Sequence, residues 1–219
     1  MPDSDNLYIA IIADIIASRA LPNRAACQQL LEEFLLRLNN TQPKAIVSRF
    51  IITIGDEFQG LLRADAQEAL VDIWRSIDAA AFPFHLRMAI GCGKIDTALK
   101  TEAVGMDGPA FHRARHGLEH LKQHGGSLTF QTGNDKCDMH LNTIAVLWDA
   151  VRSSWTKRQR AIYASYRNSK SQRDLAQAYG VSPSAISRML KRMHASQLDS
   201  AEANLMAIIS ECLPRLPNS

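Results

Sequence analysis

Residues 45–62 read AIVSRFIITIGDEFQGLL. The first ten are rich in β-branched side chains, which predicts a strand. Gly55 and Asp56 suit a tight turn, because glycine and aspartate tolerate the backbone angles that such turns need. Residues 58–62 then return as the second strand of a hairpin. The adjacent Asp56 and Glu57 belong either to an ordinary turn or to the acidic end of a metal and phosphate site.

Further elements follow on both sides of this hairpin. Apolar β-branched residues at 7–16 and 84–95 predict buried strands, and a short strand is expected at 127–130. Helical spacing of apolar residues predicts helices over 27–38, 65–77 and 110–123. The first six elements follow the order β-α-β-β-α-β, which is typical of a split βαβ, or ferredoxin-like, sheet. We therefore predict an α+β fold: a ferredoxin-like, palm-like domain over residues 1–130, a linker at 131–142 and an all-α domain at 143–219.

Cysteine usage and the N-terminus bear on where the protein works. The four cysteines are scattered, without any C-x-x-C pair, which argues against a disulfide framework and favours a reducing cytoplasm. The N-terminal residues MPDSDN carry no basic segment, and Asp14 interrupts the apolar run that follows. We therefore expect neither a signal peptide nor a membrane span.

Charge is distributed unevenly along the 219 residues. Residues 151–195 carry ten Lys/Arg and one Asp, whereas the rest of the chain carries 15 Lys/Arg and 21 Asp/Glu. The first segment is therefore strongly basic and the remainder acidic, although the net charge of the chain is only +3. This asymmetry indicates an acidic body joined to a module that faces nucleic acid.

Within the basic segment, residues 171–193 read SQRDLAQAYGVSPSAISRMLKRM. Ser171 can cap one helix, Gly180 can form a tight turn, and Ser182 followed by Pro183 can open a second helix. This stretch resembles the helix-turn-helix of sigma-factor region four, which implies binding to double-stranded DNA. The base-reading candidates are Ser182, Ser184, Ser187 and Arg188, and the phosphate contacts are Lys170, Lys191 and Arg192. The alternative is a helical hairpin that contacts only protein.

Asp14 ends the first predicted strand, which lies beside the hairpin in a split βαβ sheet. That neighbourhood would bring Asp14 close to Asp56, and two such carboxylates repel each other unless a cation lies between them. Hard oxygen ligands suit Mg²⁺ or Mn²⁺ carrying a nucleoside triphosphate. Each aspartate also has a structural alternative, since Asp14 could cap the next segment and Asp56 could simply form the turn.

Four blocks carry a family resemblance: ADIIASR, TIGDEFQG, RMAIGCG and VGMDGPAFHRAR, at residues 13–19, 53–60, 87–93 and 104–115. They occur in the order of a class III nucleotide cyclase domain, and GDEF is similar to the turn of the diguanylate cyclases. Together with the basic C-terminal segment, they resemble the SatD family over nearly the whole chain.

The cyclase resemblance implies roles for individual residues. Asp14 and Asp56 match the two metal-binding aspartates, and Glu57 matches the acidic residue of the diguanylate cyclase turn. The phosphate-contacting backbone corresponds to Ile15, Ile16, Ala17 and Ser18, together with Gly55 of the turn.

Other cyclase positions are not matched. Ile52 stands where adenylate cyclases carry a base-selecting Lys, and Pro109 or Phe111 stands where the transition-state Asn belongs. Arg113 or Arg115 could replace the transition-state Arg.

Two functional hypotheses follow. We favour a DNA-binding transcriptional regulator whose cyclase-like domain senses a nucleotide or metal without turnover, because the base-selecting and transition-state positions are missing. The alternative is an active nucleotide cyclase or nucleotidyltransferase that uses a divalent metal at Asp14 and Asp56. The last helix has an apolar face, explained by core packing or by formation of a homodimer, at Leu205, Ile208, Ile209, Cys212 and Leu213.

Overall fold

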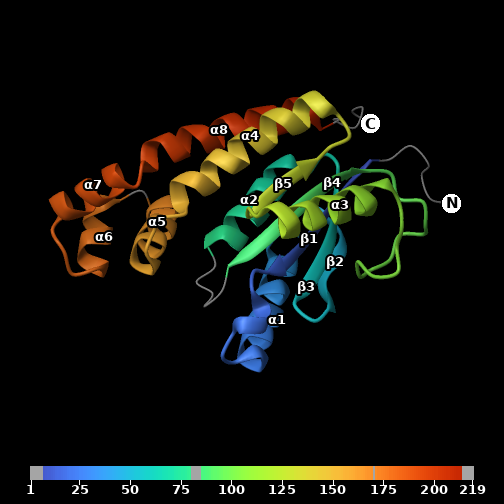
Figure 1. Cartoon of the computed structure of the whole chain (residues 1–219), viewed down its shortest axis with the longest axis horizontal. Helices are drawn as coiled ribbons and strands as arrows, with labels where there is room; N and C mark the ends of the chain where they lie inside the picture. The colour runs from blue at the N-terminus through green and yellow to red at the C-terminus, as the bar shows by residue number, and fades with distance from the viewer. Residues whose placement is uncertain (1–6, 80–84, 170, 214–219) are drawn as a thin grey trace.

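The computed structural model describes residues 7–79, 85–169 and 171–213. It is a mixed α+β structure in which a five-stranded sheet is flanked by helices, and a group of helices extends beyond one end of the sheet (Figure 1). Lys170, one of the predicted DNA phosphate contacts, lies outside the described residues.

The sheet has the strand order β2-β3-β1-β4-β5. Strand β1 is central and runs antiparallel to both β3 and β4, whereas the edge strand β5 is parallel to β4. The predicted hairpin is formed by β2 and β3, which are antiparallel on either side of Gly55 and Asp56. The bounds are β1 Tyr8–Ile15, β2 Ile46–Ile54, β3 Glu57–Arg63, β4 Leu86–Gly93 and β5 Leu128–Gln131.

Side-chain alternation divides the sheet into two faces. Ile9, Ile11 and Ala13 of β1 belong to the larger core, which includes α1 (Arg24–Thr41) and α2 (Gln67–Ala79). Ala10 and Ile12 point the other way, into a smaller core beneath α3 (Pro109–His124). Both faces of β1 are therefore buried, as expected from its continuous apolar sequence.

Helix α3 lies unusually close to β4. A Cβ atom on Gly91 would come within 2.2 Å of the Ala110 carbonyl oxygen and 2.3 Å of the Ala114 nitrogen. Only glycine permits this approach of helix backbone to strand, and it brings the polar side chains of α3 down onto the sheet.

The helical part differs from the expected linker at 131–142. Helix α4 (Asp135–Arg152) already begins at residue 135, and the Asn134 side chain accepts the backbone N–H groups of Lys136 and Cys137. The polar residues that resemble a loop in the sequence therefore form a helix cap. The remaining helices are α5 (Lys157–Ser169), α6 (Gln172–Ala178), α7 (Pro183–Arg192) and α8 (Ala195–Cys212).

Helices α4 and α8 lie side by side along the upper edge of the view in Figure 1. A disulfide joins Cys137 of α4 to Cys212 of α8, with a Cα–Cα distance of 5.9 Å. The expectation that the cysteines do not form disulfides is therefore wrong for this pair. The two cysteines are 75 residues apart in the sequence, so only the packing of the two helices reveals the pairing.

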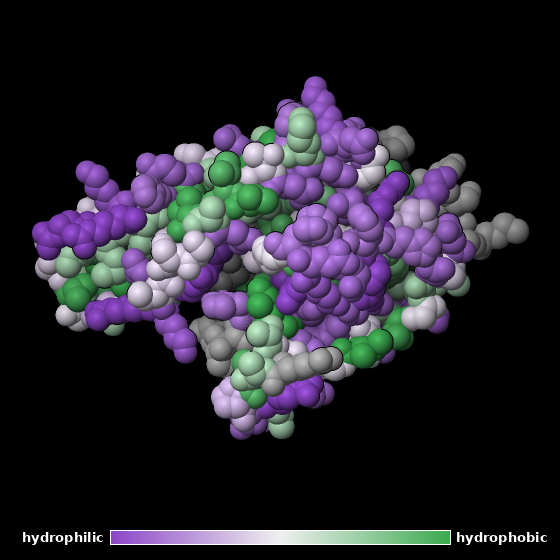
Figure 2. Space-filling model, in the orientation of Figure 1, coloured by the Kyte–Doolittle hydropathy of each residue, from purple (hydrophilic) through white to green (hydrophobic). Residues whose placement is uncertain are grey.

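The apolar face predicted for the last helix packs into the protein. Leu205, Ile209 and Leu213 are each no more than 3% exposed and belong to the larger core. Exposed hydrophobic side chains occur instead on α4, where Met139, Val146 and Leu147 are 58–65% exposed, and Figure 2 shows hydrophobic atoms gathered over this region. Homodimer formation stays a prediction. Across the described ranges, no helix is long and apolar enough to span a bilayer.

A buried ion cluster connects the sheet to the helical part. Arg167 of α5 donates to Glu202 of α8 at 2.5 Å, and Glu202 also pairs with Arg75 of α2. The Arg167 guanidinium also lies over the rings of Trp74 and Trp148, at 5.4 and 5.7 Å from their centroids. The carboxylate of Glu202 on α8 therefore balances positive charges contributed by two other helices, α2 and α5.

We expect Glu202→Ala to lower the free energy of unfolding by about 3–5 kcal/mol, because it leaves the largely buried Arg167 without its carboxylate. Urea unfolding followed by circular dichroism measures the change. Glu211→Ala removes an exposed carboxylate from the same helix and should change stability by no more than about 0.5 kcal/mol. Equal effects of the two substitutions would contradict this role of Glu202.

Candidate functional site

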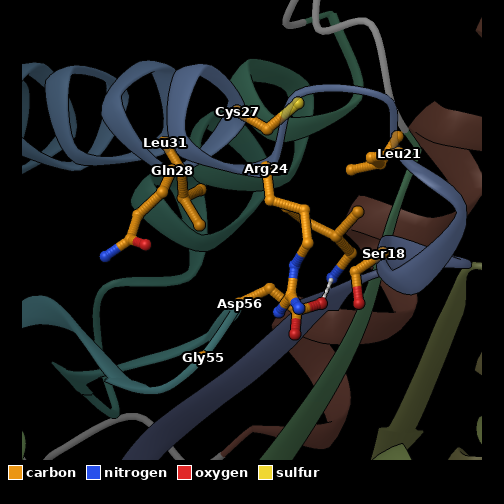
Figure 3. Close-up of a pocket in the computed structure, with 9 residues that line it drawn as sticks. Ser18, Leu21, Arg24, Cys27, Gln28, Leu31, Gly55 and Asp56 are labelled. Atoms are coloured by element: carbon orange, nitrogen blue, oxygen red, sulfur yellow. Dashed lines mark hydrogen bonds between the residues drawn. The ribbon is translucent and has the colours of Figure 1, made fainter.

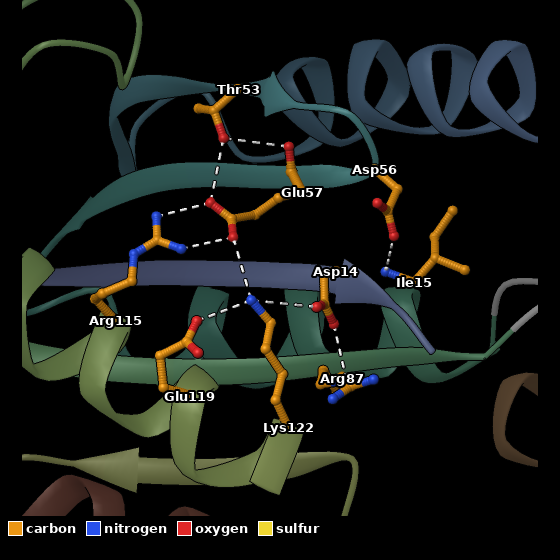
Figure 4. Close-up of polar contacts among 9 residues, drawn as sticks. All are labelled: Asp14, Ile15, Thr53, Asp56, Glu57, Arg87, Arg115, Glu119 and Lys122. Carbon is orange, nitrogen blue, oxygen red and sulfur yellow. Dashed lines mark hydrogen bonds and ion pairs between the residues drawn. The ribbon is translucent and has the colours of Figure 1, made fainter. Parts of the chain in front are cut away.

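Asp14 and Glu57 come together on the face of the sheet that α3 covers. Asp14 follows Ala13 on β1 and points away from the larger core, and Glu57 opens the neighbouring strand β3 with the same orientation. Figure 4 shows the two carboxylates reaching toward a shared Lys122. The placement follows from alternation, because every second residue of adjacent strands faces the same way.

Arg87 is the first cation of this group. It lies directly opposite Asp14 in the β1–β4 register, with its Nε 2.9 Å from Asp14 Oδ1. The two atoms form an ion pair but lack hydrogen-bond alignment. Both side chains are largely buried, at 15% and 11% exposure, so solvent screens this attraction only partly.

Helix α3 supplies the other charges from one side. Arg115 donates two hydrogen bonds to Glu57, at 2.5 and 2.7 Å. Lys122, seven residues later on the same helical face, has its Nζ 3.7 Å from Asp14 Oδ2 and 3.8 Å from Glu57 Oε2. Glu119 lies between them and contacts the same Nζ at 2.9 Å. We call these six residues the α3-side charge cluster: Asp14, Glu57, Arg87, Arg115, Glu119 and Lys122.

Asp56 occupies a different environment. Its Oδ2 accepts the backbone N–H of Ile15 at 3.2 Å, which ties the hairpin turn to the end of β1. The same carboxylate lines a small pocket, partly open to solvent, between this turn and α1 (Figure 3). Arg24, the first residue of α1, extends into the pocket toward Asp56. The lining residues are Ile15, Ser18, Leu21, Arg24, Cys27, Gln28, Leu31, Gly55 and Asp56.

The predicted phosphate-contacting residues are therefore divided. Ile15, Ser18 and Gly55 line the pocket between the hairpin turn and α1, which we call the α1-side pocket. Ile16 donates its N–H to the His85 carbonyl at 2.8 Å, which removes that group from ligand binding in this conformation. Ala17 adopts a left-handed backbone, with φ of 56°, where the chain turns from β1 into a short 3₁₀ helix, Ser18–Ala20.

The two candidate catalytic arginines also differ. Arg115 reaches Glu57, as described above, and is half-exposed. Arg113 instead donates to the Cys92 carbonyl at 2.5 Å, and its guanidinium lies against Gly133. Arg113 therefore braces the end of β4 against the segment after β5, away from the carboxylates.

The arrangement fits a divalent metal poorly. Both Glu57 oxygens accept from Arg115, both Asp14 oxygens lie against cations, and Asp56 is engaged by Ile15. Over the described ranges, no group of three or more His, Cys, Asp or Glu side chains is placed to hold a metal ion. Mg²⁺ or Mn²⁺ binding stays a prediction from the sequence.

The predicted DNA-contacting residues lie on and beside α7. Ser182 caps this helix by accepting the Ala185 N–H at 3.2 Å, Pro183 is its first residue, and the preceding turn uses Gly180 with φ of 64°. Ile186 and Leu190 are buried. The outward positions are all exposed: Ser182, Ser184, Ser187, Arg188, Lys191 and Arg192.

Sequence analysis missed four charged members of these sites: Arg24, Arg87, Glu119 and Lys122. The sequence holds a signal for two of them, Lys122 and Arg87. Lys122 lies seven residues after the candidate Arg115 and so shares its helical face. Arg87 has the parity of Ala89 and Gly91, which lie on the face of β4 that α3 covers. Neither pattern says which strand the helix covers, so the partners emerge only from the fold.

Burial raises the pKa of Asp14 to about 6. Desolvation is the largest cause, and Arg87 and Lys122 oppose it by favouring the ionised form. The pKa of Glu119 is lowered, chiefly by its hydrogen bond from Lys122. Lys122 thus acts electrostatically on at least two carboxylates.

The sequence model described as the SatD family matches residues 8–199. No curated protein matches the chain. Two solved structures of a bacterial light-regulated adenylyl cyclase are similar, each with a TM-score of 0.44. The first is 16% identical and covers 61% of this chain and 80% of its own; the second is 15% identical and covers 57% and 43%. Likeness at this level says nothing about activity.

We expect the Asp14 side chain to titrate with a midpoint of about 6 rather than the ordinary 3.8. Because the folded-state pKa is the higher one, this carboxyl favours folding at low pH, and that contribution is lost as pH rises from 3.8 to about 6. Carboxyl ¹³C chemical shifts measured against pH test the midpoint.

Lys122→Met should raise the Asp14 midpoint further, since Lys122 stabilises the ionised form. Lys136→Met, which removes an exposed lysine from α4, is the matched control and should leave it unchanged. A wild-type midpoint near 4, or an unchanged one in Lys122→Met, would contradict the assigned electrostatics.

Proposed function

The chain belongs to the SatD family, and we propose that it is a DNA-binding regulator whose sheet domain senses a nucleotide. Helices α6 and α7 form the proposed helix-turn-helix, and α7 is the proposed recognition helix. The observation that carries this proposal is the exposed face of α7. It combines three serine hydroxyl groups near the capped N-terminus with three basic side chains farther along the helix.

The chemistry of that face suits duplex DNA. Ser182, Ser184 and Ser187 stand near the helix N-terminus, where recognition helices approach base edges. Arg188 follows one turn later as a further base-reading candidate, and Lys191 and Arg192 lie beyond it and can neutralise phosphates. A helix used only to pack against protein would gain nothing from this uncompensated positive charge.

The α1-side pocket supports the nucleotide part of the proposal. Arg24 and Ser18 offer a cation and a hydroxyl to a phosphate, and Leu21, Cys27 and Leu31 offer an apolar wall to a base or sugar. Asp56 and Gln28 can bind donor groups of the ligand. The strand order of β1 to β4, with β1 between β3 and β4, supports a ferredoxin-like, cyclase-type arrangement around this pocket.

Contacts between the two parts offer a route for regulation. Helix α2 of the sheet domain touches α5 and α8, and the Arg75–Glu202–Arg167 cluster lies at that junction. Ligand binding that shifted α1 and α2 would therefore act on the helices that carry α6 and α7.

Catalytic turnover is the alternative. It is less supported, because the carboxylates of Asp14 and Glu57 are paired with protein cations and Arg113 is used structurally. Incubation with labelled ATP, GTP, CTP and UTP plus Mn²⁺ separates the two functions. We expect binding without product; a cyclic or oligomeric product that disappears in Asp56→Ala would show an enzyme.

For DNA binding, we expect Arg188→Ala/Lys191→Ala/Arg192→Ala to weaken binding at least about tenfold and to reduce the salt dependence of log K by about 0.9 per lost phosphate contact. Gel shifts with duplex DNA at several salt concentrations measure both quantities. The matched control is Lys44→Ala/Lys100→Ala/Lys136→Ala, which removes three exposed lysine side chains outside α7. If both triple variants bind like the wild type, α7 is not the DNA-binding helix.

A further inference from the structure

We infer that Lys122 is a built-in counter-ion: its ammonium takes the place between Asp14, Glu57 and Glu119 that a divalent cation would otherwise fill. This inference goes beyond the proposed function and does not depend on whether the chain binds DNA or a nucleotide.

The geometry of Lys122 is that of a bound cation. Its Nζ contacts carboxylate oxygens from three elements: Asp14 of β1 at 3.7 Å, Glu57 of β3 at 3.8 Å and Glu119 of α3 at 2.9 Å (Figure 4). Its side chain is only about one-third exposed, at 34%. An ordinary surface lysine has no reason to lie at the meeting point of three acids contributed by strands and helix.

The cluster is also nearly balanced without any added ion. Three carboxylates, from Asp14, Glu57 and Glu119, face three cations, from Arg87, Arg115 and Lys122. A divalent ion would bring two further positive charges next to the ammonium, which like-charge repulsion disfavours. It would also have to compete for Glu57 oxygens that Arg115 already holds in a two-point contact.

The charge balance of the cluster explains why removing Lys122 should change its affinity for cations. Without the ammonium, Asp14, Glu57 and Glu119 would surround a position with one net negative charge to spare. Carboxylate oxygens from several directions are the ligands that Mn²⁺ and Ca²⁺ prefer, and water can complete the shell. The wild-type chain should therefore bind the ion weakly or not at all, and a chain lacking the lysine should bind it more tightly.

The first experiment measures Mn²⁺ binding to the full-length wild-type protein by the loss of the free-ion electron paramagnetic resonance signal, with and without ATP. We expect no saturable site tighter than about 1 mM at the α3-side charge cluster. One Mn²⁺ per chain that is lost in both Asp14→Asn and Glu57→Gln, with or without ATP, would overturn the inference. Mn²⁺ binding that requires ATP and is retained in both variants occurs outside the α3-side charge cluster, and it is consistent with the inference.

The second experiment repeats the titration on Lys122→Met. We expect a site at least about tenfold tighter than in the wild type, and Glu119→Gln added to this variant should weaken it again. Lys122→Arg keeps the charge and Lys136→Met removes an exposed lysine on α4, so both should behave like the wild type.

Circular dichroism establishes that each variant is folded, and Lys122→Gln replaces Lys122→Met if the latter is not. A folded variant without Lys122 that gains no Mn²⁺ affinity would contradict the inference. The nucleotide and DNA assays above use other residues, so their failure is distinguishable from failure here.

Discussion

The alternation of side chains along β1 is the constraint on which the site depends. Because β1 lies in the middle of the sheet, both of its faces are covered, and each residue must belong to one side or the other. Asp14 therefore cannot share the α1-side pocket with Ile15 and must face α3. The same rule places Glu57 with Asp14 and leaves Asp56, in the turn, on the opposite side. One strand thus divides an acidic motif that looks continuous in the sequence.

The close approach of α3 to the sheet explains why the carboxylates on this face are paired with cations. Gly91 allows the helix backbone to touch β4, and that contact lowers Arg115 and Lys122 onto the carboxylates. The result is a partly buried set of paired charges on one face and a small pocket with polar and apolar walls on the other. The proposed nucleotide-binding pocket on the α1 side and the paired charges on the α3 side are built on the two faces of the same sheet.

Much of the fold could be predicted from the sequence, for identifiable reasons. Runs of β-branched residues predicted the strands, and capping by Ser171 and Ser182 predicted α6 and α7. The prediction of a linker at 131–142 was wrong for the part that forms α4, because a helix N-cap and a loop use the same polar residues. The Cys137–Cys212 disulfide was not predicted, because it depends on the packing of two helices that are far apart in the sequence.

The site was harder to predict than the fold. Asp14 and Glu57 were singled out, because acids at the end of an apolar strand are conspicuous. Their partners were not, because Arg87, Glu119 and Lys122 look like ordinary charged residues of a strand and a helix until the helix is placed over the sheet. Charge pairing between elements is a property of the tertiary structure, and local sequence patterns do not contain it.

The most direct test of this account is a crystal structure of the wild-type protein soaked with Mn²⁺ and a nucleoside triphosphate, with anomalous diffraction recorded for manganese. The account predicts that Lys122 stays between Asp14, Glu57 and Glu119 and that no anomalous peak appears among them. A manganese peak bonded to Asp14 and Glu57, with the Lys122 ammonium displaced, would contradict it.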